Sequence, residues 1–289
     1  MDLAMPPLLV LVARREGRDD WLVTVPETVR VLEERCSLEV GEPYQPGGQT
    51  AWVAPALGKA GEQLVLKVGW AHPEAAHEGA GLREWDGNGA VRLFASEEFD
   101  ETSALLLERC IPGVSLTSTP GHEQDVVIAG LLRRLWRAPM STTTFRPLQV
   151  MCDGWADEFE QKVPTPGVRL DPGLARDGIA LFRNLSASAD QHVLLCTDLH
   201  AGNVLAAERE PWLVIDPKPY VGDPVYDLLQ HTLNNEDRLL AEPTHFSRRM
   251  ADLAGVDAGR LLLWLFARCV QESPERPSLA EVARQVAPA

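Results

Sequence analysis

Strand patterns and helix patterns occupy different parts of this 289-residue chain, which restricts the folds open to it. Before residue 111, short apolar and β-branched runs predict strands at 64–68, 91–95 and 104–108. After Ile111-Pro-Gly113, apolar residues at helical spacing predict helices at 125–137, 153–162 and 171–185. This order is typical of α+β proteins. We therefore expect a strand-rich N-lobe over residues 1–110 and a mainly helical C-lobe over residues 111–289.

Local signals set the expected ends of several helices. Pro26 and Pro73 predict the starts of N-lobe helices that end near Cys36 and Trp85, because proline fits the first turn of a helix. In the C-lobe, Asp171-Pro172 predicts a capped helix start, and Ser278-Leu-Ala-Glu281 has the pattern of a capping box.

The most informative stretch is Cys196-Thr-Asp-Leu-His-Ala-Gly-Asn203, which is followed by Trp212-Leu-Val-Ile-Asp216. The short apolar segments after Asn203 and before Asp216 predict a hairpin, which would bring these two side chains to one edge. An Asp and an Asn separated by four residues are common by chance, and alone they indicate little. The second Asp at the end of an apolar strand makes the combination specific.

Protein kinases carry their catalytic Asp, a metal-binding Asn and a second metal-binding Asp in this same order. Asp198 is then the base that takes a hydroxyl proton. Asn203 and Asp216 offer the oxygen ligands that Mg²⁺ prefers. Lys218 lies two residues beyond Asp216, within reach of a phosphate or a loop carboxylate. The stretch predicts phosphoryl transfer.

Lys67 lies inside an apolar strand, where an unpaired ammonium group is costly to bury. A carboxylate partner together with nucleotide phosphates would resolve that cost. Glu74, Glu78 and Glu84 of the following helix are all eligible, and Glu78 is favoured because it lies in mid-helix. The alternative is an edge-strand lysine that points to water.

Glycine motifs give little further evidence for a nucleotide-binding site. Gly47 and Gly48 would let backbone amides approach a phosphate, although they fit a plain turn equally well. The sequence contains no Walker motif, no dinucleotide fingerprint and no Gly-x-Ser-x-Gly hydrolase elbow.

The formal charge of −15 argues against nucleic acid or an anionic membrane as a partner and favours a cationic small molecule. The five scattered cysteines show no CxxC spacing, which predicts a reducing, cytoplasmic setting. The longest late apolar run, residues 261–267, is too short to cross a bilayer. The sequence does not distinguish a monomer from a dimer.

Several segments resemble the aminoglycoside phosphotransferase family, most closely its streptomycin 6-phosphotransferase and hydroxyurea kinase branch. The most specific part of the resemblance runs from Thr197 to Asp227. The segments are Thr197-Asp-Leu-His-Ala-Gly-Asn-Val-Leu205, Trp212-Leu-Val-Ile-Asp-Pro-Lys-Pro219, Gly222-Asp-Pro-Val-Tyr-Asp227, Glu42-Pro-Tyr-Gln-Pro-Gly-Gly48, Val65-Leu-Lys-Val68, Leu105-Leu-Leu-Glu-Arg-Cys110 and Cys269-Val-Gln-Glu-Ser273.

This resemblance implies a bilobal, protein-kinase-like fold that binds ATP or GTP with Mg²⁺. It implies the same roles for Asp198, Asn203 and Asp216, and makes Lys67 with Glu78 the pair that positions the phosphates. Glu108 to Cys110 would form the hinge whose backbone meets the nucleobase. The usual His-Gly-Asp opening of the family is here Cys196-Thr197-Asp198. His200 is interpreted as a loop-packing residue rather than a replacement for that histidine.

The implied acceptor is an aminoglycoside hydroxyl, with streptomycin as the leading candidate. The candidate acceptor contacts are Asp223, Asp227, Glu272 and Glu158. Asp223 is equally suited to cap the helix that begins at Pro224. The alternatives are a kinase of hydroxyurea or of another small hydroxylated molecule, a kinase-like binding protein without activity, and a metal-dependent hydrolase built on Asp198, His200 and Asp216.

Overall fold

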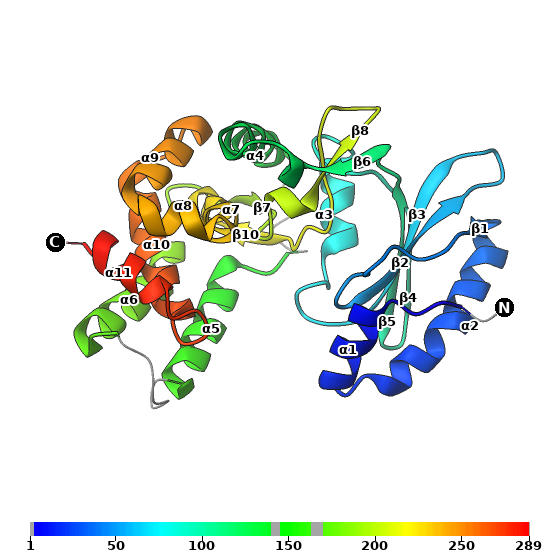
Figure 1. The fold of residues 1–289 in the computed structure, drawn as a ribbon, viewed down its shortest axis with the longest axis horizontal. Helices are drawn as coiled ribbons and strands as arrows, with labels where there is room; N and C mark the ends of the chain where they lie inside the picture. Colours follow the sequence, from blue (N-terminus) through cyan, green and yellow to red (C-terminus); the bar gives the residue numbers. More distant parts are fainter. Residues whose placement is uncertain (1–2, 140–144, 163–169, 289) are drawn as a thin grey trace. The chain divides into compact units, whose positions relative to one another are not determined.

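The computed structural model of the protein describes residues 3–139, 145–162 and 170–288. The chain divides into two compact units, of which the first is strand-rich and the second is mainly helical (Figure 1). The first unit comprises Met1–Gly113 and Ala206–Leu213, and the second comprises Val114–Leu205 and Val214–Ala289. The α+β class is as predicted. The segment Ala206–Leu213, which the sequence assigned to the C-lobe, belongs instead with the first unit.

The first unit contains a five-stranded antiparallel sheet in the order β1-β2-β3-β5-β4. Its strands are β1 (Glu39–Val40), β2 (Ala51–Leu57), β3 (Gln63–Trp70), β4 (Leu93–Phe99) and β5 (Thr102–Glu108). The register places Lys67 of the central strand β3 opposite Val53 of β2 and Leu105 of β5. Lys67 therefore lies in mid-sheet, and the alternative of an edge-strand lysine is wrong.

Alternation along β3 sends neighbouring side chains to opposite faces of the sheet. Leu64, Leu66, Val68 and Trp70 are buried in a core shared with α1 (Pro7–Arg15) and α2 (Asp19–Cys36). Lys67 therefore projects from the other face, where it meets Glu78 of α3 (Glu78–Trp85). The sheet thus separates an apolar core from a polar site.

The two proline signals in this unit were misleading. Helix α2 begins at Asp19, so Pro26 lies inside it, because the buried face formed by Trp21, Val25 and Val29 extends past the proline. Helix α3 begins only at Glu78, since the residues from Pro73 to His77 form turns. Helix α1 was not predicted.

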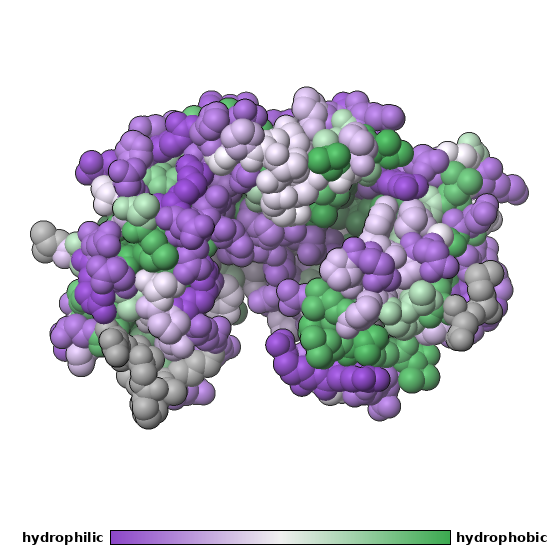
Figure 2. Space-filling view, viewed as in Figure 1, coloured by the Kyte–Doolittle hydropathy of each residue, from purple (hydrophilic) through white to green (hydrophobic). Residues whose placement is uncertain are grey.

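The surface of the first unit carries exposed apolar residues near α1 and α2. Leu11 is 68% exposed and Val23 is 78% exposed, and Figure 2 shows apolar surface in this region. Leu9, Val12 and Val25 of the same helices are buried. Both helices are therefore amphipathic only in part.

In the second unit, helices surround the largely buried helix α10. Its helices are α4 (Gly121–Leu135), α5 (Leu148–Lys162), α6 (Pro172–Leu185), α7 (Leu228–Asn234), α8 (Glu236–Ala241), α9 (Pro243–Ala254), α10 (Ala258–Glu272) and α11 (Leu279–Val286). Leu261, Trp264 and Phe266 of α10 are almost completely buried. Phe182 of α6 and Tyr226 meet Trp264 edge to face, which joins three segments in one aromatic core.

Short strands complete the structure. β7 (Val193–Leu195) pairs antiparallel with β10 (Tyr220–Gly222). β6 (Pro112–Ser115), β8 (Val204–Ala207) and β9 (Leu213–Val214) form a three-stranded sheet in the order β6-β8-β9, which confirms the predicted hairpin. Across the described ranges, no helix is both long enough and apolar enough to span a membrane.

Of the caps predicted at Asp171 and Ser278, the first is present. The Asp171 side chain accepts hydrogen bonds from the amides of Gly173 and Leu174, as expected for an N-cap. Ser278 makes no capping bond, because its hydroxyl group donates to Glu236 instead. The predicted capping box is therefore wrong, and a contact distant in the sequence replaced it.

Candidate active site

In the first unit, Lys67 and Glu78 form a buried ion pair. The Lys67 Nζ lies 2.7 Å from both Glu78 carboxylate oxygens, and the two side chains are 15% and 5% exposed. Glu78 occupies the first turn of α3, where the helix dipole favours a carboxylate. The cost of burying each charge is offset by its partner.

Gly47 and Gly48 follow a cis Gln45–Pro46 bond. Gly47 has a φ of 92°, and a Cβ atom there would lie 2.3 Å from the Pro6 Cβ. Close approach of the N-terminal segment therefore accounts for this glycine without a ligand.

Glu108 and Cys110 lie at the end of β5, the predicted hinge. Arg209, in the turn between β8 and β9, donates to both Glu108 carboxylate oxygens at 2.8 Å and also to the carbonyls of Gly87 and Ala90. Burial would raise the pKa of Glu108, but the contacts with Arg209 and Arg92 outweigh it and lower that pKa. Burial raises the pKa of the Cys110 thiol to about 11. Glu108 thus secures this turn within the first unit.

In the second unit, both carboxylate oxygens of Asp198 are held. The Gln230 Nε2 donates to Oδ1 at 2.9 Å, and the Lys218 Nζ lies 2.9 Å from Oδ2. Asn203 donates its side-chain amide to the Asp198 carbonyl at 3.0 Å. Lys218 was predicted to reach a phosphate or a loop carboxylate, and in the structure it contacts a loop carboxylate, that of Asp198.

Asn203 and Asp216 lie at the two ends of the hairpin. The Ile215 amide donates to the Asn203 carbonyl at 2.9 Å, which brings residues 203 and 216 close along the paired backbone. Because the Asn203 amide nitrogen bonds Asp198, its amide oxygen is the atom left to coordinate a cation. The exposed Asp216 has a φ of 52°, a conformation that is uncommon for a residue other than glycine.

Asp227 supports the loop that contains Asp198. It accepts hydrogen bonds from the amides of Cys196 and Thr197, at 3.1 and 2.7 Å, and from the Trp136 indole at 2.9 Å. Burial raises the pKa of Asp227 to about 6 against the opposing effect of these donors. Asp227 is fully buried, so the prediction that it contacts an acceptor is corrected to a role in fixing the loop.

Thr197 occupies a position whose backbone conformation would favour glycine. Its φ is 50°, which is strained for a β-branched residue. The hydroxyl group donates to the Lys218 carbonyl at 2.5 Å, and the Lys218 amide donates to the Cys196 carbonyl at 2.9 Å. These contacts help to offset the strain.

His200 behaves as the loop-packing residue that was predicted. Its Nδ1 accepts a hydrogen bond from the Gly202 amide at 3.1 Å. Burial lowers the pKa of His200, although nearby Asp198 opposes this effect. Among the described residues, no group of three or more His, Cys, Asp or Glu side chains has the arrangement of a metal site.

The other three candidate acceptor contacts differ in how exposed they are and in what they contact. Asp223 is buried and accepts from the Val225 amide, Arg260 and Trp264, so it caps the 3₁₀ turn Pro224–Asp227 and is not available to an acceptor. Glu272 is 19% exposed and ion-pairs with Arg268 and Arg276. Glu158 is exposed on α5.

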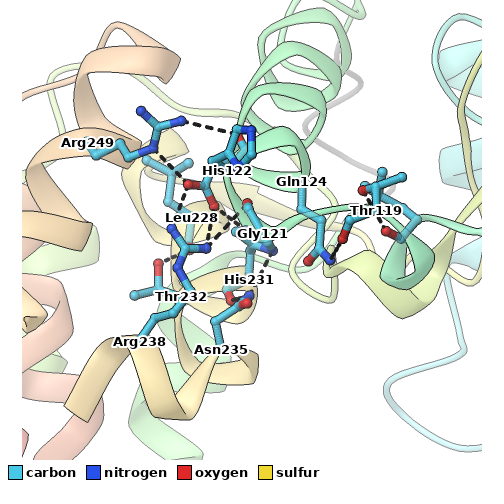
Figure 3. A network of polar contacts seen from close by, with 12 residues as sticks. Thr119, Gly121, His122, Gln124, Leu228, His231, Thr232, Asn235, Arg238 and Arg249 are labelled. Carbon is cyan, nitrogen blue, oxygen red and sulfur yellow. Dashed lines mark hydrogen bonds and ion pairs between the residues drawn. The ribbon is translucent and has the colours of Figure 1, made fainter. Parts of the chain in front are cut away.

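A second buried cluster lies around Asp125 of α4. Its partners His231, Arg238 and Arg249 are labelled in Figure 3. Arg238, Arg249 and His231 all contact its carboxylate, at 2.7 to 3.1 Å. Burial would raise the pKa of Asp125, but these partners outweigh it and hold that pKa well below its ordinary value. The cluster joins α4, α7, α8 and α9.

Sequence reasoning missed Gln230, Arg209 and the Asp125 cluster. One weak signal could have identified Gln230 as a site residue, because it lies one helical turn after the candidate Asp227. Arg209 and Asp125 have none, since their partners are distant in the sequence.

Comparison with known proteins agrees with this geometry. The family described as aminoglycoside/hydroxyurea antibiotic resistance kinase matches residues 39–275. Streptomycin 6-kinase of Streptomyces glaucescens is 32% identical over 276 residues, covering 92% of this chain and 88% of that protein. Hydroxyurea phosphotransferase of Kitasatospora aureofaciens is 36% identical over 276 residues, covering 92% and 78%.

Two solved structures share the fold at low sequence identity. Macrolide 2'-phosphotransferase MphH from Brachybacterium faecium has a TM-score of 0.56, with 17% identity over 91% of this chain and 98% of that one. Spectinomycin phosphotransferase APH(9)-Ia, in complex with ADP and spectinomycin, has a TM-score of 0.55 with 12% identity over 91% and 94%. The chain belongs to the aminoglycoside/hydroxyurea antibiotic resistance kinase family.

Proposed function

We propose that this protein transfers the γ-phosphoryl group of ATP or GTP to a hydroxyl group of an aminoglycoside, with the 6-hydroxyl of streptomycin as the target. The observation that carries the proposal is the loop around Asp198, whose carboxylate is held at both oxygens by Gln230 and Lys218. Similarity to the streptomycin 6-kinases of Streptomyces glaucescens and Streptomyces griseus, at 32% and 33% identity, supports the substrate.

In the proposed reaction, Asp198 orients the acceptor hydroxyl and accepts its proton. The bond between the γ-phosphorus and its bridging oxygen breaks, a bond from that phosphorus to the acceptor oxygen forms, and the nucleoside diphosphate leaves. Because phosphoryl transfer passes through a loose transition state, orientation of the hydroxyl matters more than the strength of the base.

The residues at the hairpin ends fit Mg²⁺. Asn203 contributes an amide oxygen and Asp216 an exposed carboxylate, which are hard oxygen donors of the kind Mg²⁺ prefers. Bound there with the nucleotide, the ion would neutralise charge on the phosphates. Lys67, held by Glu78, would position the phosphates, and the end of β5 from Glu108 to Cys110 would meet the base.

The overall charge of −15 supports a cationic acceptor such as streptomycin, because long-range attraction would raise its association rate. Glu272 and Glu158 are the remaining candidates for contacts with that acceptor. The five free cysteines fit a reducing, cytoplasmic setting.

Hydroxyurea is the second candidate acceptor, because the hydroxyurea phosphotransferase is 36% identical to this chain. A binding protein without activity is disfavoured, since binding alone does not require a doubly held Asp198 carboxylate. A hydrolase is disfavoured because the Nδ1 of His200 already accepts from the backbone.

Mass spectrometry of an acceptor panel tests the proposal. The protein is incubated with Mg²⁺, ATP or GTP, and either streptomycin, hydroxyurea, other aminoglycosides or small hydroxylated metabolites. We expect phosphorylated streptomycin at a rate far above background hydrolysis of the nucleotide. Phosphorylation of hydroxyurea alone would favour the second candidate, and no phosphorylated acceptor with either nucleotide would contradict the proposed function.

A further inference from the structure

We propose that Gln230 is a positioning residue for Asp198, holding its carboxylate so that one lone pair of Oδ1 points to the acceptor hydroxyl. This inference rests on the proposed function, in which Asp198 accepts the hydroxyl proton. The contact that carries it is the hydrogen bond from the Gln230 Nε2 to the Asp198 Oδ1, at 2.9 Å.

The two short contacts to the Asp198 carboxylate differ in kind, and Asn203 donates weakly to Oδ2 at 3.5 Å. Lys218 brings a positive charge to Oδ2, whereas Gln230 brings a neutral amide to Oδ1. A carboxylate oxygen has two lone-pair positions, so one amide donor leaves the second position of Oδ1 open to a hydroxyl. A neutral donor fixes the direction of the carboxylate while opposing its proton uptake less than a cation would.

Gln230 lies close along the chain to a residue that already supports the loop. Asp227, one helical turn earlier, holds the amides of Cys196 and Thr197. One short stretch, from Asp227 to Gln230, thus contacts three successive residues of the loop, 196 to 198. The Gln230 amide is the member of this set that touches the base itself.

The residue after Gln230 anchors the same helix from the other side. His231 is completely buried and contacts Asp125, which Arg238 and Arg249 also hold (Figure 3). Gln230 therefore extends from a helix fixed by buried contacts on both sides, and its own side chain is only half-buried. Replacing Gln230 should change the position of the Asp198 carboxylate without opening the core.

The test is Gln230→Met, which keeps the length of the side chain and removes the donor. We expect kcat for acceptor phosphorylation to fall about 10- to 100-fold, the range for loss of a residue that orients a reacting group. The KM for the nucleotide and the melting temperature should stay at wild-type values. Gln230→Glu, which places a like charge beside Asp198, should lower kcat at least as much.

Gln285→Met is the matched control, because Gln285 is exposed on α11 and bonds only the nearby Glu281 among the described contacts. A wild-type kcat in Gln230→Met would overturn the inference. So would a fall in kcat that is matched by a lower melting temperature or by an equal fall in Gln285→Met, since either would give Gln230 no specific role.

Crystal structures of wild type and Gln230→Met separate this inference from the proposed function. If wild type phosphorylates no acceptor, the proposed function fails, and the positioning claim is decided by the position of Asp198. A carboxylate that has turned away from its wild-type position in the variant supports positioning. An unchanged carboxylate, still bonded to Lys218, overturns it.

Discussion

The two units bury charge in different ways. In the first, Lys67 and Glu78 form an ion pair between a strand and a helix. In the second, Asp125, Asp223 and Asp227 each accept several donors from different segments. The first arrangement joins one strand to one helix through opposite charges, whereas the second fixes loops and helices.

Asp198 differs from these three carboxylates because it is held and yet only partly buried, and its replacement should have the largest effect. We expect Asp198→Asn to lower kcat by about 10²- to 10⁴-fold, the range for removal of a general base. Nucleotide affinity measured by calorimetry should be retained. Asp237→Asn, on the exposed face of α8, is the control. Near-normal turnover in the Asp198 variant would contradict its role as base.

In the Lys67–Glu78 pair of the first unit, the effect of replacing one member should depend strongly on the other. Lys67→Met leaves the buried Glu78 carboxylate without the lysine, and we expect this variant to lose about 3 kcal/mol in the free energy of unfolding. Glu78→Gln weakens the pair from the other side. The double variant should lose less than the sum of the two single losses. Urea unfolding measures all three, with exposed Lys59→Met as the control. Additive losses would show that the pair is not coupled.

The clusters of the second unit should respond to pH in opposite directions. Because burial raises the pKa of Asp227 to about 6, its contribution to stability should fall as pH rises from about 4 to about 6. Because its partners lower the pKa of Asp125, its contribution should be complete above about pH 5 and be lost as pH falls below 4.

Urea unfolding of wild type, Asp227→Asn and Asp125→Asn between pH 3 and 7 measures both slopes. The stability advantage of wild type over Asp227→Asn should shrink across its window, and the advantage over Asp125→Asn should grow as pH rises from 3 to 5. Parallel slopes would mean that the two carboxylates are held in the same way.

Thr197 should give the smallest effect. Thr197→Gly removes the strain of the positive φ but also the hydroxyl bond to Lys218, so we expect its unfolding free energy to stay within about 1 kcal/mol of wild type. Thr197→Val keeps the strain and loses the bond, and it should be the less stable of the two. The reverse order in urea unfolding would show that the strain is negligible.

Sequence patterns were sufficient where the partners lie close along the chain. The hairpin that joins Asn203 to Asp216 and the pairing of Lys67 with Glu78 were both predicted, because each involves neighbouring elements. The start of α2 was not predicted, since the buried face that continues it past Pro26 depends on packing against the sheet. Asp223 and Asp227 looked like surface carboxylates because their donors, Arg260 and Trp136, are remote in sequence.

The turn secured by Arg209 has a consequence for dividing the protein. Because the segment Ala206–Leu213 belongs with the first unit, a gene fragment that encodes residues 114–289 would carry a peptide whose partners Glu108, Gly87 and Ala90 are missing. Expressing the helical unit alone therefore requires that this peptide be excised and that Leu205 be spliced to Val214. Simple truncation at a single point would leave both pieces incomplete.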